Sequence, residues 1–195
     1  MPRRTVCISH ATGAGGRAVG RTVADRLGFR YVDEEVIAEA AEWADLDPSI
    51  VADAERRKPL VERMLGGPAE DGAPPEAEVR ALIIEVLRAF AERGSVVIVS
   101  HAASFALADR ADLDVLRVLV TASPATRARR VAAGGETSAR DAERQIRKED
   151  DARADYLQRF YGVAQELNTH YDVVLNTDVL TLDEAVGLIE GVAAA

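Results

Sequence analysis

The chain has 195 residues, 48% of them hydrophobic, which is enough for one domain, residues 1–195, around a substantial buried core. Its 33 acidic residues outnumber its 24 basic residues, and the formal net charge of −9 argues against nucleic acid or an anionic membrane as a partner. Cys7 is the single cysteine, which excludes an intrachain disulfide and a zinc–cysteine cluster and suits a reducing cytosol.

The amino-terminal residues carry no recognisable targeting signal. Only a few apolar residues lie between Arg4 and His10, far fewer than a signal-peptide core or a membrane span requires. We therefore expect a cytoplasmic protein.

Apolar runs and helical patterns alternate along the chain. In chain order, the predicted elements are a strand at 5–9, a helix at 17–27, a strand at 29–32, a helix at 33–45, a charged helical stretch at 45–65, a mobile loop near 66–76, and a helix at 76–93. Strands at 95–99 and 116–120 follow, then a long helix at 125–162 that is broken at Gly134-Gly135, a strand at 171–176 and a closing helix. Five buried strands alternating with helices predict an α/β fold with a parallel sheet covered on both faces.

A glycine-rich loop follows the first strand and leads into the first helix. Gly13-Ala14-Gly15-Gly16 would place free backbone N–H groups and the positive end of a helix around an anion. The same cluster could also be a turn without a ligand. Its position favours phosphate, because open parallel sheets bind ligands at the carboxyl ends of their strands.

Two phosphate-binding motifs fit this loop. Gly13-x-Gly15-x-x-Ala18 matches the dinucleotide fingerprint, and Asp33 ends the second strand where a ribose-binding acid would lie. In that fingerprint the first glycine normally comes directly after the strand, whereas His10-Ala11-Thr12 intervene here and give a loop of P-loop size. The P-loop interpretation is therefore favoured over the dinucleotide one.

The P-loop is incomplete, because Gly16-Arg17-Ala18 replaces the usual Gly-Lys-Ser/Thr. Neither the lysine that neutralises phosphate charge nor the hydroxyl that holds magnesium is in register. Arg17 is the only basic residue between Arg4 and Arg21, so we expect it to be the main cation of the loop. Its wider planar head is not equivalent to a lysine ammonium group.

Three segments resemble the cytidylate kinase-like family. They are Ile8 to Gly20 together with Leu27-Gly28 and Tyr31-Val32-Asp33, then Arg147 to Tyr156 continuing to Phe160-Tyr161-Gly162, and finally Tyr171 to Thr177. In that family the first segment also lacks the lysine. The second resembles the family's lid motif Asp-x-Ala-Arg-Ala-x-Tyr, which is more specific than a glycine loop and sets aside the dinucleotide interpretation.

The chain departs from the family pattern at two places. It has His10-Ala11 where family members usually carry Arg-Glu, and Ser100-His101-Ala102 where they carry Gly-Arg-Gly. Two expected arginines have become histidines. Because phosphoryl transfer depends on charge neutralisation, these losses bear directly on rate.

The resemblance implies a P-loop NTPase-type three-layer α/β/α fold with a helical lid near 132–162. Its sheet would have the order 2-3-1-4-5, with the first strand central so that its loop faces both nucleotide sites. The implied reaction is transfer of the γ-phosphate of ATP, with Mg²⁺, to CMP, dCMP or a related acceptor. The expected partner is thus a small-molecule nucleotide, and the sequence leaves the oligomeric state open.

The residues that the motifs and the resemblance select form the candidate site. The expected catalytic residues are Arg17, Arg147, Asp150 and Arg153. The expected nucleotide-binding residues are Thr12, Gly13, Ala14, Gly15, Gly16, Arg17, Ala18, Arg127 and Arg130. The expected substrate-binding residues are Asp33, His101 and Tyr156, and no residue is assigned to a metal.

The arginines of the helical stretch at 125–162 have a functional and a plainer interpretation. Arg147, Asp150 and Arg153 can share one helix face. There Arg153 would bridge phosphates while Asp150 holds it or the substrate, or the three form a solvated charge stripe. Arg127 and Arg130 would lie beneath the adenine, where a guanidinium can stack on a base, or are ordinary surface arginines.

The expected substrate-binding residues have plainer alternatives as well. Asp33 lies where monophosphate kinases bind the acceptor but could cap the following helix. His101 could donate to phosphate when protonated or be structural. Tyr156 belongs to the lid match, although aromatic residues at helical spacing are usually core residues.

The missing lysine, hydroxyl and paired arginines support a second hypothesis. It is a catalytically weak or silent module of the same fold that binds a nucleotide or another phosphorylated ligand without transfer. A third, an NAD(P)-dependent oxidoreductase, would need a nicotinamide site that nothing after the second strand suggests.

Overall fold

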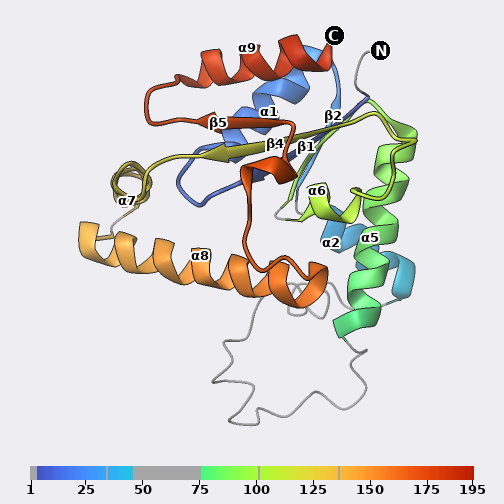
Figure 1. Ribbon diagram of the computed structural model, residues 1–195, viewed down its shortest axis with the longest axis horizontal. Coiled ribbons are helices and arrows are strands. Elements are labelled where there is room, and N and C mark those ends of the chain that lie inside the picture. The colour runs from blue at the N-terminus through green and yellow to red at the C-terminus, as the bar shows by residue number, and fades with distance from the viewer. Residues whose placement is uncertain (1–3, 34, 46–75, 101, 136) are drawn as a thin grey trace.

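Five parallel strands form the sheet at the centre of the structure, a computed structural model that describes residues 4–33, 35–45, 76–100, 102–135 and 137–195 (Figure 1). The strands are β1 (Thr5–His10), β2 (Arg30–Val32), β3 (Val96–Val99), β4 (Val115–Thr121) and β5 (Val173–Asn176). The helices are α1 (Gly16–Leu27), α2 (Glu35–Ala44), α5 (Glu76–Arg93), α6 (Ala103–Ala106), α7 (Pro124–Ala133), α8 (Ala139–Tyr161) and α9 (Leu182–Ala193), with a 3₁₀ turn η1 at Asn168–His170.

The strand order is β2-β3-β1-β4-β5, which confirms the predicted order and the central place of β1. β1 pairs in parallel with β3 on one edge and with β4 on the other. The dinucleotide-binding fold places its second strand directly beside its first. Here β3 lies between β1 and β2, so the topology differs from that fold.

Helices cover both faces of the sheet and give three layers (Figure 1). α1 and α9 pack on one face over the buried side chains of Val6, Ile8 and Val118. α2, α5 and α6 pack on the other face around Cys7 and Ile98. Successive side chains of a strand point to opposite layers, which explains why these strands are continuous apolar runs. Within the described ranges, no helix is both long and apolar enough to cross a membrane.

Cys7 lies inside β1 and is fully buried. Burial raises the pKa of its thiol to about 12, with the charge of Arg117 opposing the rise. The thiol is therefore protonated at neutral pH. It is a small apolar core group, not an activated nucleophile.

The predicted helical stretch at 125–162 forms two helices, separated near the Gly134-Gly135 pair. Gly134 is the C-cap of α7, and Ser138 begins α8 by accepting a hydrogen bond from the Asp141 N–H. The short α6 was not predicted, because four residues are too few for a periodic pattern. Apart from their outermost residues, the expected charged helix at 45–65 and loop near 66–76 lie outside the described residues.

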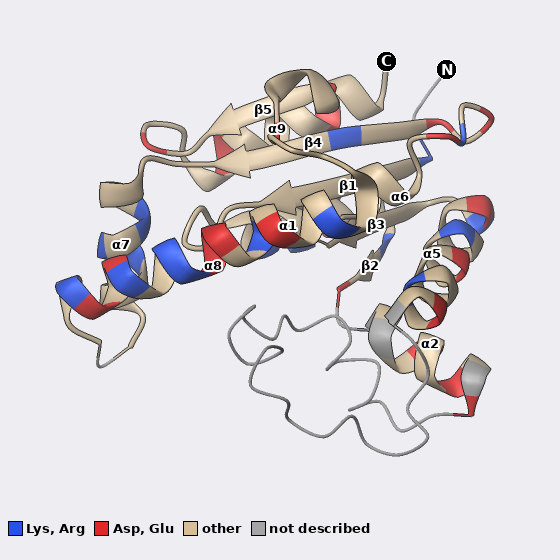
Figure 2. Cartoon of the chain, turned by 60° about the horizontal axis from the view of Figure 1, so that its bottom comes forward, with Lys and Arg blue, Asp and Glu red and all other residues tan. Residues whose placement is uncertain are grey.

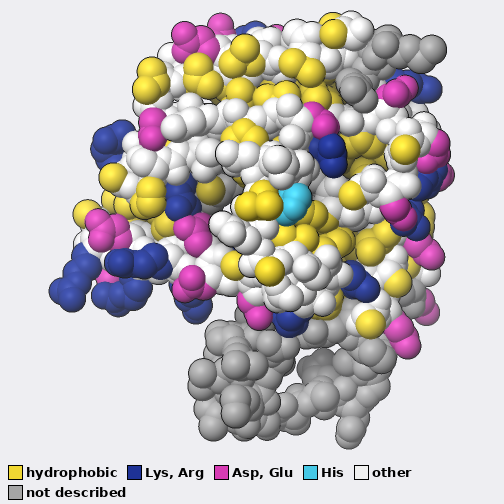
Figure 3. All heavy atoms as spheres, viewed as in Figure 1, with side chains coloured by type: hydrophobic (Ala, Val, Ile, Leu, Met, Phe, Trp, Pro, Cys, Tyr) yellow, Lys and Arg dark blue, Asp and Glu magenta, His cyan; other side chains and the backbone are white. Residues whose placement is uncertain are grey.

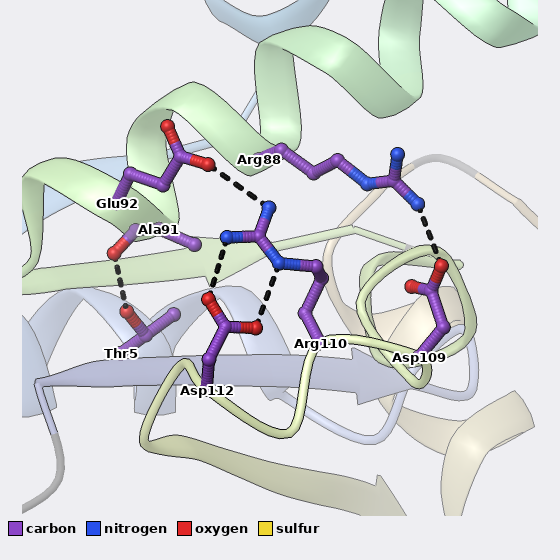
Figure 4. Close-up of polar contacts among 7 residues, drawn as sticks. All are labelled: Thr5, Arg88, Ala91, Glu92, Asp109, Arg110 and Asp112. Carbon is purple, nitrogen blue, oxygen red and sulfur yellow. Dashed lines mark hydrogen bonds and ion pairs between the residues drawn. The ribbon is translucent and has the colours of Figure 1, made fainter.

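Polar contacts at the amino end of the sheet attach α5 to the segment before β4 (Figure 4). Arg110 pairs with Glu92 of α5 at 2.9 Å and with Asp112 at 2.8 Å. The Thr5 hydroxyl donates to the Ala91 carbonyl of α5 at 3.3 Å. This cluster lies beside the first residue of β1, whereas the glycine-rich loop follows the last.

A substitution at Gly20 can test how closely α1 packs on the sheet. A Cβ at this position would lie 2.4 Å from Cγ2 of Val99, a buried side chain of β3. We expect Gly20→Ala to lower the free energy of unfolding by about 1–3 kcal/mol through overpacking. Urea denaturation followed by circular dichroism measures this change.

Gly187→Ala in α9 is the matched control, because a Cβ there meets nothing within 4 Å. Alanine is the better helix former, so this variant should gain about 0.5–1 kcal/mol. Equal effects of the two substitutions would contradict the close packing of α1 on β3.

Candidate functional site

The glycine loop, residues 11–15, joins the carboxyl end of the central strand to α1. The Ala14 N–H donates to the Ala11 carbonyl at 2.9 Å and closes a four-residue turn in which Gly13 has φ 80°. Gly15, with φ 86°, is the N-cap of α1. Glycine adopts these φ values without strain and has no side chain that could cover the first N–H groups of the helix. The loop therefore presents the amino end of α1 without a side-chain cap.

His10, the last residue of β1, packs directly against Gly16. A Cβ at Gly16 would lie 2.2 Å from the Cβ of His10, so a larger residue cannot occupy this position without a shift. Burial lowers the pKa of His10, the hydrogen bond with the Ala11 carbonyl opposes this, and the Arg153 charge lowers it further. His10 is thus a neutral packing residue at neutral pH and not a fixed cation.

Three consecutive carbonyls of the glycine loop accept hydrogen bonds from side chains of α7 and of the segment after β5. The pairs are Arg127 Nη1 with the Thr12 carbonyl at 3.4 Å, Arg130 Nη1 with the Gly13 carbonyl at 3.4 Å, and the Thr177 hydroxyl with the Ala14 carbonyl at 2.9 Å. The loop is therefore held from the side of β4 and β5, the two strands that precede these segments.

Arg127 is nearly buried although it is charged. Its guanidinium donates two hydrogen bonds to the Asp150 carboxylate of α8, at 2.9 and 2.7 Å. Its backbone also approaches the loop, since a Cβ at Gly13 would lie 2.7 Å from the Arg127 carbonyl oxygen. In this arrangement the guanidinium binds a carboxylate, and stacking on a nucleobase would require it to leave that partner.

Two consecutive carboxylates bring α8 to the glycine loop. Glu149 accepts a hydrogen bond from the Thr12 hydroxyl, and Asp150 pairs with Arg127. α8 carries alternating basic and acidic side chains where it runs beside α7 (Figure 2). The sequence predicted that arginines of this helix would face the phosphates, whereas here the contacts with the loop region come from its acids.

Arg17 and Asp33 form an ion pair beside the start of α1. Arg17 Nε lies 3.3 Å from Asp33 Oδ2, and the Tyr31 hydroxyl donates to the same oxygen at 3.1 Å. The Arg17 side chain is 60% exposed and that of Asp33 only 19%. The structure thus brings together the expected loop cation and an expected acceptor-binding acid.

Arg153 lies in a nearly buried hydrogen-bond network. Its Nε donates to Glu166 Oε2 at 2.8 Å, and its Nη2 donates to Glu166 Oε1 and to the Tyr171 hydroxyl. Burial raises the pKa of Glu166, but the hydrogen bonds and charge of Arg153 outweigh it and hold that pKa below its ordinary value. The network joins α8 to the segment before β5.

The remaining predicted site residues lie away from the glycine loop or outside the described residues. Lys and Arg side chains gather at the end of the molecule where α7 meets α8 (Figure 3). Arg147 of α8 is 76% exposed and pairs with Glu143 at 3.8 Å. Tyr156 is buried against Phe160, with ring centroids 4.8 Å apart, as the core alternative predicts. His101 is outside the described residues.

Four residues with direct contacts in this region were not predicted as site residues from the sequence: Glu149, Glu166, Tyr171 and Thr177. Thr177 follows the last strand, and polar residues at strand ends are the signal that could have identified it. Glu149 lies in the lid motif beside a selected residue. Glu166 stands in an irregular segment and offers no such signal.

A parallel sheet of this order, with a glycine loop leading from its central strand into a helix, defines a P-loop kinase-like fold. A structure of an uncharacterized protein from Eubacterium ventriosum ATCC 27560 is similar over 98% of each chain, at 17% identity and a TM-score of 0.72. Shikimate kinase from Bacteroides thetaiotaomicron is similar over 96% of this chain and 97% of its own, at 16% identity and a TM-score of 0.55. A gluconokinase from Sinorhizobium meliloti 1021 matches over 98% and 93%, at 14% identity and a TM-score of 0.53.

The family follows from the sequence match. Residues 5–179 match the cytidylate kinase-like family, and the chain belongs to this family. No curated protein matches the chain. The solved structures, at these low identities, show the fold alone.

The Arg153–Glu166 pair should make stability depend on pH. Glu166→Gln removes the charge that neutralises a nearly buried guanidinium, so we expect a loss of about 1.5–3 kcal/mol at pH 7. The folded-state pKa of Glu166 is lowered, so its contribution is complete above the ordinary value of 4.5 and is lost as the pH falls through the lowered value. Urea denaturation between pH 7 and pH 3 should show the difference between variant and wild type shrinking with acid.

Asp155→Asn is the control for this experiment, because Asp155 forms an exposed ion pair with Arg159 on the same helix. Its effect should stay below about 0.5 kcal/mol at every pH. A Glu166→Gln protein whose stability declines with acid as steeply as the wild type would contradict the pairing.

Proposed function

We propose that this protein is a cytoplasmic phosphotransferase that moves the γ-phosphoryl group of ATP to a nucleoside monophosphate of the CMP or dCMP type. The observation that carries the proposal is the glycine loop at the carboxyl end of the central strand, with α7 and α8 in contact with it. Membership of the cytidylate kinase-like family supports the acceptor class. The P-loop kinase-like fold supports the reaction class.

In this proposal the triphosphate binds to the backbone amides of residues 12–18, at the positive end of α1. Arg17, exposed beside the loop, supplies charge in place of the missing lysine. Arg130, at the Gly13 carbonyl, lies close to the bound phosphates or base. Arg127 would first have to exchange Asp150 for the nucleotide.

The acceptor is proposed to bind on the side of Asp33, and His101 is kept as a further acceptor ligand on the evidence of the sequence alone. Asp33 is held by the Tyr31 hydroxyl and pairs with Arg17, so it lies next to the proposed donor site. Arg147 and Arg153 of α8 are the proposed phosphate ligands between donor and acceptor. Arg153 would exchange its bond with Glu166 for a phosphate oxygen, and Arg147 has an exposed side chain that can reorient.

Mg²⁺ would accompany ATP and neutralise charge on its phosphates. The Thr12 hydroxyl and the Glu149 carboxylate, which touch at the glycine loop, are oxygen ligands of the type that Mg²⁺ prefers. In the described part of the chain, no group of three or more His, Cys, Asp and Glu side chains is placed to hold a metal ion. Mg²⁺ commonly takes most of its ligands from phosphate and water, so one or two protein oxygens suffice.

A second candidate function is nucleotide or phosphate binding without transfer. The charge pairing favours it: Asp150 neutralises Arg127, and Asp33 neutralises Arg17. Phosphoryl transfer depends on cations that stabilise the transferring group. If these carboxylates stay in place when ATP binds, little positive charge remains for catalysis.

An assay of ADP release separates the two functions. We expect turnover with ATP, Mg²⁺ and CMP or dCMP, and less or none with UMP and AMP. Shikimate and gluconate belong in the same panel, because two similar structures are a shikimate kinase and a gluconokinase. Binding of ATP by calorimetry without turnover on any acceptor would contradict transfer and support the binding module.

Arg17→Ala tests the proposed loop cation. We expect weaker ATP binding by about 1.5–3 kcal/mol, the range for a hydrogen bond to a charged group, measured by titration calorimetry. Arg17→Lys keeps the charge but not the planar fork, so it should recover part of the loss.

Arg144→Ala serves as the control for Arg17→Ala. Arg144 is 71% exposed and pairs with Asp141 on the same helix. Its removal should leave ATP affinity unchanged. Equal affinity in the Arg17→Ala protein would mean that the backbone amides hold the triphosphate without this charge.

A further inference from the structure

Thr177 makes the shortest of the three side-chain hydrogen bonds to the backbone carbonyls of the glycine loop. Its hydroxyl is nearly buried and donates to the Ala14 carbonyl at 2.9 Å. The other two contacts of this kind, from Arg127 and Arg130, are longer, at 3.4 Å each. Of the three carbonyls, that of Ala14 therefore has the closest side-chain donor.

Thr177 is itself fixed by its neighbours. Its N–H donates to the Thr121 carbonyl at 2.8 Å, which continues the pairing of β4 with β5 by one residue. Arg130 donates through Nη1 to the Thr177 hydroxyl oxygen at 2.9 Å and through Nη2 to the Thr177 carbonyl at 2.6 Å. The hydroxyl oxygen accepts from Arg130, and its single hydrogen has two carbonyls within reach, that of Ala14 at 2.9 Å and that of Thr121 at 3.2 Å, of which the Ala14 carbonyl is the nearer.

Fixing the Ala14 carbonyl also fixes the next amide. In a planar trans peptide, the C=O of one residue and the N–H of the next point in opposite directions. The Ala14 oxygen points into the protein toward Thr177, so the Gly15 N–H points away from it. Gly15 is exposed and is the N-cap of α1, where an anion would meet the helix.

We propose that Thr177 is a positioning residue for the glycine loop, which turns the Gly15 amide toward a bound phosphate group. The inference rests on the proposed binding of a triphosphate at this loop. Thr177 touches the protein and not the ligand, so it acts through Ala14 and Gly15. A hydroxyl is required, and a methyl group alone does not replace it.

The test compares Thr177→Val with Thr177→Ser. Valine keeps the shape and loses the donor, whereas serine keeps the donor and loses a methyl group. We expect Thr177→Val to weaken the binding of both ATP and inorganic tripolyphosphate by about tenfold, in equal measure, because the Gly15 N–H is no longer held toward the phosphates and its hydrogen bond to them weakens. Thr177→Ser should bind both ligands within about threefold of the wild type.

Thr5→Val is the matched control. It also removes a buried threonine hydroxyl that donates to a backbone carbonyl, here that of Ala91 at the other end of β1 (Figure 4). Its melting temperature should fall, by less than that of Thr177→Val because the Thr177 hydroxyl also accepts from Arg130, while its affinity for ATP stays unchanged. Equal affinity of Thr177→Val and Thr5→Val for tripolyphosphate would overturn the positioning role and leave Thr177 as a structural residue.

The Gly15 amide gives a readout that does not depend on nucleotide binding. Its ¹⁵N–¹H resonance and its hydrogen-exchange rate should change in Thr177→Val and stay near the wild-type values in Thr177→Ser and Thr5→Val. If the wild type binds neither ATP nor tripolyphosphate, the proposed function fails, and this resonance still decides whether Thr177 orients the loop. An unchanged Gly15 amide in Thr177→Val would overturn the inference.

Discussion

The pairing of β1 on both of its edges is the constraint on which the rest of the structure depends. β3 and β4 hydrogen-bond to it from either side, and helices bury both of its faces. A strand enclosed in this way has no freedom to shift, because a slip by one residue would exchange the side chains of the two layers. The glycine loop that follows β1 therefore begins from a fixed point at the centre of the carboxyl edge.

Charge at this edge is arranged in pairs. Two arginines of this edge have carboxylate partners: Arg17 has Asp33, and Arg127 has Asp150. A protein with a net charge of −9 can still attract a triphosphate if these partners separate when it arrives. The affinity for a nucleotide then depends on a difference in free energy between two sets of ion pairs. One set lies within the protein, and the other forms between the protein and the ligand.

The fold could be predicted from the sequence because the residue patterns of strands and helices are local and repeat along the chain. Short, largely apolar segments between helical patterns predicted all five strands, and the resemblance supplied the order that places β1 at the centre. α6 was missed because its four residues form barely one helical turn. The predicted break at Gly134-Gly135 is confirmed, because α7 ends at Gly134 and α8 begins after Ser138.

The candidate site was only partly predictable, because side-chain pairing depends on distances across the fold. Spacing along α8 predicted that Arg147, Asp150 and Arg153 could share a face, yet it contained no information on the partners that each one finds. Arg153 binds Glu166, which lies in an irregular segment with no periodic pattern. Thr177 becomes significant only when the end of β5 is placed beside Ala14, 163 residues earlier in the chain.

The single thiol makes the central strand observable in solution. Cys7 reacts with an alkylating reagent only as a thiolate exposed to solvent, and in the folded protein it is buried and protonated. Its side chain points into the layer of α2, α5 and α6, so a reagent reaches it only when this layer separates from the sheet. The rate at which such a reagent labels the chain therefore measures how often these helices separate from the sheet, read from one atom that the protein already contains.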